Sequence, residues 1–226
     1  MPYRTLGAPV GSLLDFAGLS VPAGWLECLG QAVSRATYAR LLAALTTVLN
    51  GTLTVDSLVV TGLASTADLF PGMYVEGEGI HVPGWITSVD SDTQVTLSHT
   101  PTVSGVKSLT FFPHGNGNGS TTFNVPDLSQ RVVIGRKTTD ETMKAAGQKV
   151  GAETAVLAED QLPAHAHSQD VRSTVLTSSG SSPTGDMASG AVYESMSQGS
   201  STGSTGSGAA VSLMQPSLVV RKIIKT

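Results

Sequence analysis

The sequence predicts a mainly β fold with one short helix, of the α+β class. Only 13% of the 226 residues are charged, half of the ~25% usual in globular proteins, whereas 25 residues are glycine. Short apolar runs alternate with turn residues along the chain, and one stretch shows helical spacing. Because 40% of the residues are hydrophobic, the chain can bury a core. We therefore expect a folded protein that is rich in strands and loops.

The N-terminal part predicts a strand, a turn and then the helix. The strand is expected over 10–16, and the turn PAGW at 22–25 brings Trp25 to the edge of a core. Ser34 is the predicted N-cap of the helix. The apolar positions of the helix fall at i, i+3, i+4 and i+7, which is one face: Tyr38, Leu41, Leu42 and Leu45. We interpret this stripe as core packing.

Residues 51–112 differ in character from the rest of the chain. They contain the runs TLTVDSLVV, GMYVEG, GWITSV, TQVTLS and KSLTFF, separated by turn residues. This pattern predicts a small, separate β-domain, either a meander or a compact barrel-like sandwich. His81 and His99 lie beside its turns and are expected at the surface rather than as metal ligands. Trp85 is expected either in the core of this domain or at its surface, where a sugar ring could stack on it.

The glycine-rich segment 114–128 does not fit a phosphate-binding loop, because no Gly-Lys-Ser/Thr follows it. We interpret it as a flexible loop that enters a strand ending at Pro126 and Asp127. Residues 177–208 contain 11 serines and 7 glycines and cannot bury much of their own surface. The run SLVVRKIIK, residues 217–225, predicts a final strand.

Charge and composition exclude several classes of partner. The net charge of −4 leaves no basic field for nucleic acid or an anionic membrane, and the cluster of Arg221, Lys222 and Lys225 is too small to supply one. No apolar stretch reaches the ~18 residues that span a bilayer, so no membrane insertion is expected. The single cysteine, Cys28, is interpreted as a small buried hydrophobe. We expect a soluble protein without an export signal.

No motif in the chain predicts an enzyme. A glycosidase needs two carboxylates that face each other across a cleft, and no acidic pair stands out. A Gly-x-Ser-x-Gly turn and a His-Glu-x-x-His helix are both missing from the sequence. The sequence therefore predicts no catalytic residues.

Six blocks in order resemble the phage tail collar domain family, which occurs in tail-fibre tips. They are GSLLDFAG, VPAGWLECLGQ, SRATYARLLAAL, GNGSTTFNVPDLSQRVVIG, LAEDQLPAHAH and MQPSLVVRKIIKT. The family's Pro-x-Gly-Trp block is matched by Pro22, Gly24 and Trp25, its helix tyrosine by Tyr38, and its Thr-Thr-Phe-Asn-x-Pro-Asp-Leu block by 121–128. The chain departs from the family at Leu29 and Ala158.

This resemblance implies a collar-type β domain made of residues 1–50 and 113–226, with a Gly/Ser-rich tip loop at 168–212. The β-domain at 51–112 interrupts it and resembles small β-modules of phage fibre proteins. Insertions are tolerated at exposed loops. The resemblance also implies an intertwined homotrimer.

His165 and His167 stand in the block LPAHAH. In an extended segment both imidazoles point the same way, with Cβ atoms roughly 7 Å apart, but two ligands do not complete a metal site. They are either solvent-facing polar residues or ligands shared across a threefold axis, where three chains supply six nitrogens for an octahedral divalent transition metal. Iron as that metal is implied by the resemblance.

The family resemblance implies a virion tail-fibre or tail-tip protein, assembled in the host cytoplasm, that acts as a trimeric adhesin for the bacterial surface. Its partners are then other tail or baseplate proteins and a surface polysaccharide or outer-membrane protein. The alternative is a structural tail or baseplate component without receptor binding. Candidate receptor contacts are Tyr193 in the tip loop and Trp85 in the inserted domain, and the sequence does not decide between these two surfaces.

Overall fold

The computed structural model describes residues 7–137, 139–140, 143–158, 161, 209–213 and 215–226. The chain divides into two compact units, one made of residues 1–151 and 216–226 and the other of residues 152–215. The described residues are mainly β with a single helix, which confirms the predicted fold class.

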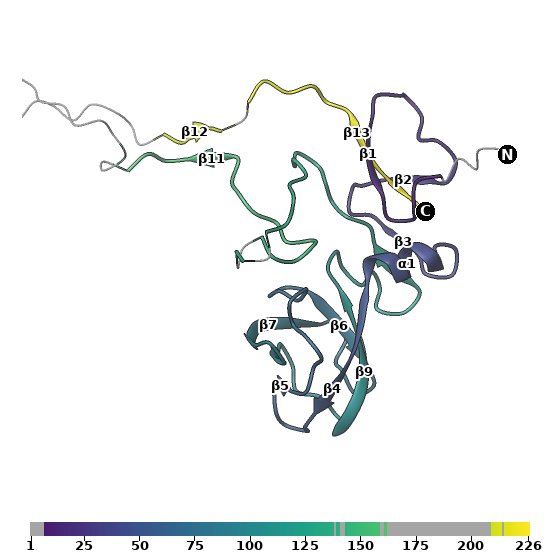
Figure 1. Ribbon diagram of the computed structural model, residues 1–226, viewed down its shortest axis with the longest axis vertical. Helices are drawn as coiled ribbons and strands as arrows, with labels where there is room; N and C mark the ends of the chain where they lie inside the picture. Colours follow the sequence, from purple (N-terminus) through teal and green to yellow (C-terminus); the bar gives the residue numbers. More distant parts are fainter. Residues whose placement is uncertain (1–6, 138, 141–142, 159–160, 162–208, 214) are drawn as a thin grey trace, which may run out of the picture. The chain divides into compact units, whose positions relative to one another are not determined.

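Two small sheets form the collar part of the first unit. The first contains β1 (Leu13–Phe16), β2 (Trp25–Glu27) and β13 (Arg221–Lys225), with β13 between the other two strands (Figure 1). The second pairs β3 (Ala32–Ser34) with β10 (Thr122–Asn124). The final strand is shorter than predicted, because Leu218 and Val219 lie outside it and are 86% and 94% exposed.

The helix α1 (Ala39–Leu45) begins later than the sequence predicted. Its N-cap is Tyr38, which makes no side-chain capping bond. Ser34 belongs to β3 instead, and its hydroxyl accepts a hydrogen bond from the Thr37 amide in the turn before the helix. The predicted cap is therefore wrong, because the strand extends through Ser34. The apolar stripe is confirmed, since Leu41 is fully buried and the other three side chains pack around the same core.

Residues 47–112, which we call the β module, form one six-stranded antiparallel sheet in the order β4-β9-β6-β7-β8-β5 (Figure 1). Its strands are β4 (Thr47–Leu53), β5 (Val59–Val60), β6 (Tyr74–Gly77), β7 (Gly84–Ser91), β8 (Gln94–Leu97) and β9 (Gly105–Phe112). A single bridge between Thr52 and Thr61 links the two edge strands. The chain enters on β4 and leaves on β9, and these strands pair along their whole length.

The run TLTVDSLVV does not form one strand. A turn at Asp56, whose φ is 66°, separates β4 from β5. A left-handed backbone is tolerated better by Asp than by the branched residues around it. The alternating apolar pattern continues across the turn, which is why the sequence alone does not reveal the break.

The first unit contains two apolar cores that share strand β9. Phe111 is fully buried among the inward-facing residues of the β module. Its neighbour Phe112 is 3% exposed and packs with Leu41, Phe123 and Ile224 in the collar core. Successive residues of a strand point to opposite faces, so one strand serves both cores. Cys28 is buried in the collar core as predicted, and this burial, followed by the charge of Glu27, raises its thiol pKa to about 11.

The glycine-rich segment is ordered by its own side chains, so the prediction of a flexible loop is wrong. The Asn118 side-chain oxygen accepts hydrogen bonds from three successive amides, those of Ser120, Thr121 and Thr122, at 2.8–3.1 Å. The Asn124 side chain accepts from the Gly117 amide at 2.8 Å. These hydrogen bonds between asparagine side chains and nearby amides take the place of the backbone hydrogen bonds of a helix or strand.

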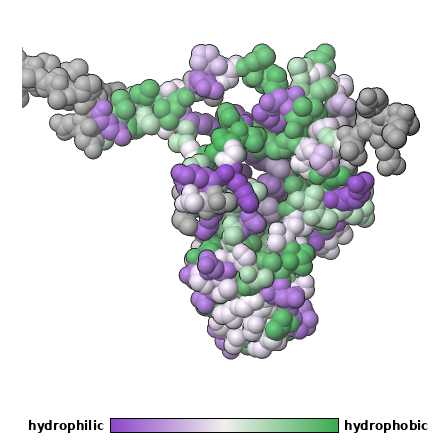
Figure 2. Space-filling view, viewed as in Figure 1, coloured by the Kyte–Doolittle hydropathy of each residue, from purple (hydrophilic) through white to green (hydrophobic). Residues whose placement is uncertain are grey.

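In the second unit, β11 (Thr154–Ala155) pairs with β12 (Val211–Ser212) as a short ribbon. Figure 2 shows hydrophobic residues gathered along this ribbon. Its exposed apolar side chains are Val156, Leu157, Val211 and Leu213, each between 49% and 60% exposed. Within the described part of this unit, no apolar side chain is buried.

Candidate functional site

Trp85 lies on the outer face of the β module. Strand β7 alternates, so that Gly84 and Ile86 are buried while Trp85 between them is 36% exposed. Its backbone carbonyl accepts from the Ser98 amide at 2.9 Å, and its amide donates to the Ser98 hydroxyl. Of the two positions left open by the sequence, core or surface, the structure shows the surface.

Three further rings join Trp85 in an aromatic row, made of Tyr74, Trp85, His99 and His81. Tyr74 is the cross-strand partner of Trp85, and their ring centroids are 6.5 Å apart with an edge-on geometry. The His99 ring stands at 89° to the indole at 5.5 Å. His81 stacks on His99 at 4.3 Å. The row presents flat apolar faces with polar edges, a surface that suits amphipathic ligands.

His81 and His99 are both exposed, as predicted, but the sequence did not predict that they stack. Hydrogen bonds hold each ring: Ser98 Oγ lies 2.9 Å from His99 Nδ1, and the Pro83 carbonyl oxygen lies 3.4 Å from His81 Nδ1. Among the residues that the structure describes, no group of three or more His, Cys, Asp or Glu side chains could hold a metal ion. The pair therefore contributes ring surface rather than a metal centre.

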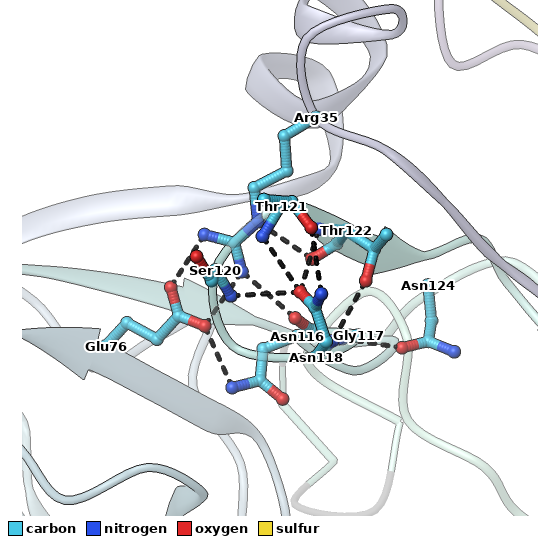
Figure 3. A network of polar contacts seen from close by, with 9 residues as sticks. All are labelled: Arg35, Glu76, Asn116, Gly117, Asn118, Ser120, Thr121, Thr122 and Asn124. Carbon is cyan, nitrogen blue, oxygen red and sulfur yellow. Dashed lines mark hydrogen bonds and ion pairs between the residues drawn. The ribbon is translucent and has the colours of Figure 1, made fainter.

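A polar junction joins the β module to the collar (Figure 3). Arg35, after β3, makes two hydrogen bonds of 2.8 Å to the carboxylate of Glu76 on β6. The guanidinium also donates to the carbonyls of Thr122 and Asn116, and it lies 5.0 Å from the centroid of the Phe112 ring. The buried Asn116 amide donates to Glu76 at 2.9 Å.

This junction fixes the aromatic row relative to the collar. A bidentate arginine–carboxylate pair is directional, and both side chains are largely shielded, with exposures of 20% and 15%. Glu76 lies two residues after Tyr74 on the same strand and the same face. A ligand bound to the row would therefore be held by the collar and not by a loose appendage.

The other predicted site residues fall outside the described residues. These are His165 and His167, the predicted metal ligands, and Tyr193, the predicted receptor contact in the tip loop. Their roles stay predictions.

Sequence reasoning missed the members of the row other than Trp85 and the whole junction. Both depend on the register between strands that are distant in sequence, such as the pairing of Tyr74 with Trp85. One signal was present: Tyr74 and Glu76 alternate with the buried Val75 in a predicted strand, which places them together on the outer face.

The fold and the surface row define a mainly β protein with a display module set into a smaller β scaffold. Residues 11–56, from β1 through α1 into β4, match the family model described as Phage Tail Collar Domain. The collar resemblance is thereby confirmed for this part of the chain. The blocks beyond residue 113 lie outside the match, and there the resemblance stays a prediction.

A phage tail collar domain at residues 11–56 suggests a protein of the phage tail-fibre type. The family is a structural one and is not known for enzymatic activity. No curated protein and no solved structure shows a significant match to the chain. The one described helix is too short to cross a membrane.

Proposed function

We propose that this tail protein is an adhesin that binds a polysaccharide of the bacterial surface through the aromatic row of its β module. The exposed Trp85 ring carries the proposal. An indole at the surface costs free energy unless a ligand covers it, and pyranose rings offer an apolar face of matching size. The flanking histidines add hydrogen-bonding edges for sugar hydroxyls.

The composition around the row favours a glycan over an outer-membrane protein. The exposed side chains of Thr87 and Thr100 are short and hydroxylated, and so is the half-buried Ser98. A protein-binding patch is usually built on a larger apolar core with several anchors. A protein receptor is the competing outcome, and the experiment below separates the two.

A homotrimer is part of the proposal, and exposed apolar side chains support it. Val132, Val133 and Ile134 are 50–74% exposed in a segment without regular structure, and Leu218 and Val219 are more exposed still. Contiguous apolar surface of this kind marks a contact with another chain. The same surface favours a second candidate function, assembly with other tail or baseplate proteins without receptor binding.

The metal proposal concerns His165 and His167. Three chains would supply six imidazoles to one divalent transition metal, with iron as the first candidate. The spacing in LPAHAH supports this, together with the finding that no described residues offer a competing cluster. Metal analysis of purified protein would give roughly one metal per three chains, and the double change His165→Ala, His167→Ala would remove it.

We also propose that the protein has no catalytic role and that it is assembled into the tail in the host cytoplasm. An enzyme of this kind would release reducing sugar from the host polysaccharide. Incubation of that polysaccharide with the purified protein is expected to release none. A time-dependent release that survives purification would contradict this part of the proposal.

The deciding experiment measures binding of the purified full chain to host cells. Trp85→Ala is expected to lower cell binding, and the ability of the protein to block infection, at least tenfold. Trp25→Ala is not a suitable control, because Trp25 contacts Lys225 in the collar. The control is Val106→Ala, which alters another exposed apolar side chain of the β module. Periodate treatment of the cells should abolish binding and protease treatment should not. Loss after protease alone indicates a protein receptor, and no binding by the wild type indicates the structural role.

A further inference from the structure

A pocket of about 780 Å³ opens beside the aromatic row, where the β module meets the collar. This volume lies within the roughly 300–1,000 Å³ of typical small-molecule sites. Phe70 and Tyr74 of the β module form one side, and His114, Asp127 and Lys149 contribute polar groups from the collar. Tyr74 lines the pocket and also contacts Trp85, so one side chain links the pocket to the row.

His114 supplies a neutral imidazole to this pocket. Burial, and then the charge of Lys149, lowers its pKa from 6.5 to about 4, so the ring carries no charge near neutral pH. A neutral imidazole has one donor and one acceptor nitrogen. Within the described residues the ring makes no hydrogen bond, and no side-chain nitrogen or oxygen is both fully buried and unpartnered. Its nitrogens are therefore open to a ligand.

The backbone around His114 keeps this space free. Gly147 has a φ of 96°, and a Cβ atom placed on it would lie 2.8 Å from Pro113 Cβ and 3.2 Å from His114 Cε1. A side chain at residue 147 would thus push against the imidazole and narrow the pocket. Glycine at this position allows the two chain segments to pass closely without closing the cavity.

The charged groups at the pocket are balanced. Lys149 Nζ and Asp127 Oδ2 are 3.9 Å apart, and the two side chains are 55% and 42% exposed. Such a long, solvated pair contributes little stability and leaves both groups able to bind a ligand. Asp127 Oδ1 accepts from the Ser129 amide. Hydrogen bonds from the Ser129 side chain and then from this amide hold the carboxyl pKa below its usual range. The residues that line the pocket thus carry one ammonium and one carboxylate and no net charge, while the charge of Arg131, outside the lining, also acts on Asp127.

We propose that this pocket binds one unit of a neutral oligosaccharide, while a neighbouring unit stacks on Trp85. Hydroxyl groups would donate to Asp127 and accept from Lys149, the His114 imidazole would take either role, and the Tyr74 ring would cover an apolar sugar face. This inference rests on the proposed function and names its ligand class. Because the lining residues carry no net charge, we expect the pocket to bind a neutral glycan in preference to an acidic one.

The test uses the purified full chain and a defined set of probes. Neutral oligosaccharides of glucose, galactose and mannose are compared with uronic-acid oligosaccharides of equal length, by saturation-transfer NMR and calorimetry. At least one neutral probe is expected to bind. Asp127→Asn and His114→Phe should each weaken it about tenfold or more, since each removes a hydrogen-bond acceptor that the sugar hydroxyls would use. Asp127→Asn retains an oxygen for the Ser129 amide, so the fold is preserved.

The outcomes separate the pocket from the proposed function. Glu78→Gln, outside the pocket, should leave probe binding unchanged and serves as the control. If Trp85→Ala abolishes cell binding while Asp127→Asn and His114→Phe retain it within twofold, the pocket proposal is wrong and the adhesin proposal stands. Tighter binding of the uronic-acid probes, or no probe binding at all, also overturns it. Probe binding without cell binding supports the pocket and contradicts the adhesin.

Discussion

The inward-facing valines of the β module contrast with valines in two irregular segments of this molecule. In the β module, Val75 and Val95 are fully buried between strands of the same chain. In the segments outside regular strands, Val132 and Val219 are 74% and 94% exposed. Val106 is 68% exposed although its strand β9 is paired, so the difference lies in whether a side chain faces a core that the chain itself supplies. The β module buries its own core, whereas these segments leave apolar side chains exposed, as the proposed trimer would require.

The largest expected effect removes the core that the β module builds for itself. Phe111→Ala deletes a fully buried ring and should lower the free energy of unfolding by about 3–5 kcal/mol. Denaturant unfolding at fixed protein concentration measures this change. Val48→Ala, on an exposed position of β4, is the control and should stay within about 0.5 kcal/mol. Equal losses at both positions would show that Phe111 does not anchor a core.

The second effect depends on pH and concerns the boundary between the two regions. His114 has a pKa near 4 in the folded protein and an ordinary value of 6.5 when unfolded. The contribution of His114 to stability is therefore full above pH 6.5, and it falls by at most about 3 kcal/mol as the pH drops toward 4. The reason is that the unfolded chain takes up the proton at a higher pH than the folded protein. The charge of Lys149 acts on the ring, and Lys149, Asp127 and Tyr74 line the same pocket as His114.

His114→Gln should remove this pH dependence. The measurement is the difference in unfolding free energy between wild type and variant from pH 7 to pH 4, which cancels the titration of other groups. A constant difference over that range would mean that the imidazole is not kept neutral by its surroundings.

A third, smaller effect tests how firmly the collar holds the β module. Glu76→Gln leaves the shielded Arg35 without its charged partner and should cost about 2 kcal/mol. The matched control is Glu78→Gln, which breaks a pair with Lys107 in which the glutamate is 69% exposed, and should cost about 0.5 kcal/mol or less. Thermal unfolding of both variants decides. Equal shifts would argue against a special role for the junction.

The smallest effect on folding should accompany a clear effect on assembly. Val132→Ser and Val219→Ser alter side chains that one chain leaves exposed, so unfolding within the chain should change by about 0.5 kcal/mol or less. If these residues pack in a trimer, both variants should dissociate at concentrations where the wild type stays associated. Sedimentation velocity measures the association, and unchanged association would show that these exposed valines do not contact a second chain.

The sequence predicts features that depend on local spacing, such as the apolar stripe of α1, the turn before Trp25 and the strand runs of the β module. It does not predict features set by contacts between distant segments. Ser34 has a capping residue's chemistry but is drawn into β3 by pairing with Thr122. Asn118 organises a glycine-rich loop that composition alone marks as flexible. The stacking of His81 on His99 and the pocket at His114 likewise follow from strand register.

The alternation of Phe111 and Phe112 along β9 restricts how this architecture can be changed by exchange of its parts. A different module grafted between β4 and β9 would have to leave each side chain of β9 on the face that it now occupies. One residue more or fewer would turn Phe112 away from Leu41 and toward the other core. Recombination that exchanges the β module is thus expected to conserve the facing of the β9 residues while the strands before β9 vary freely.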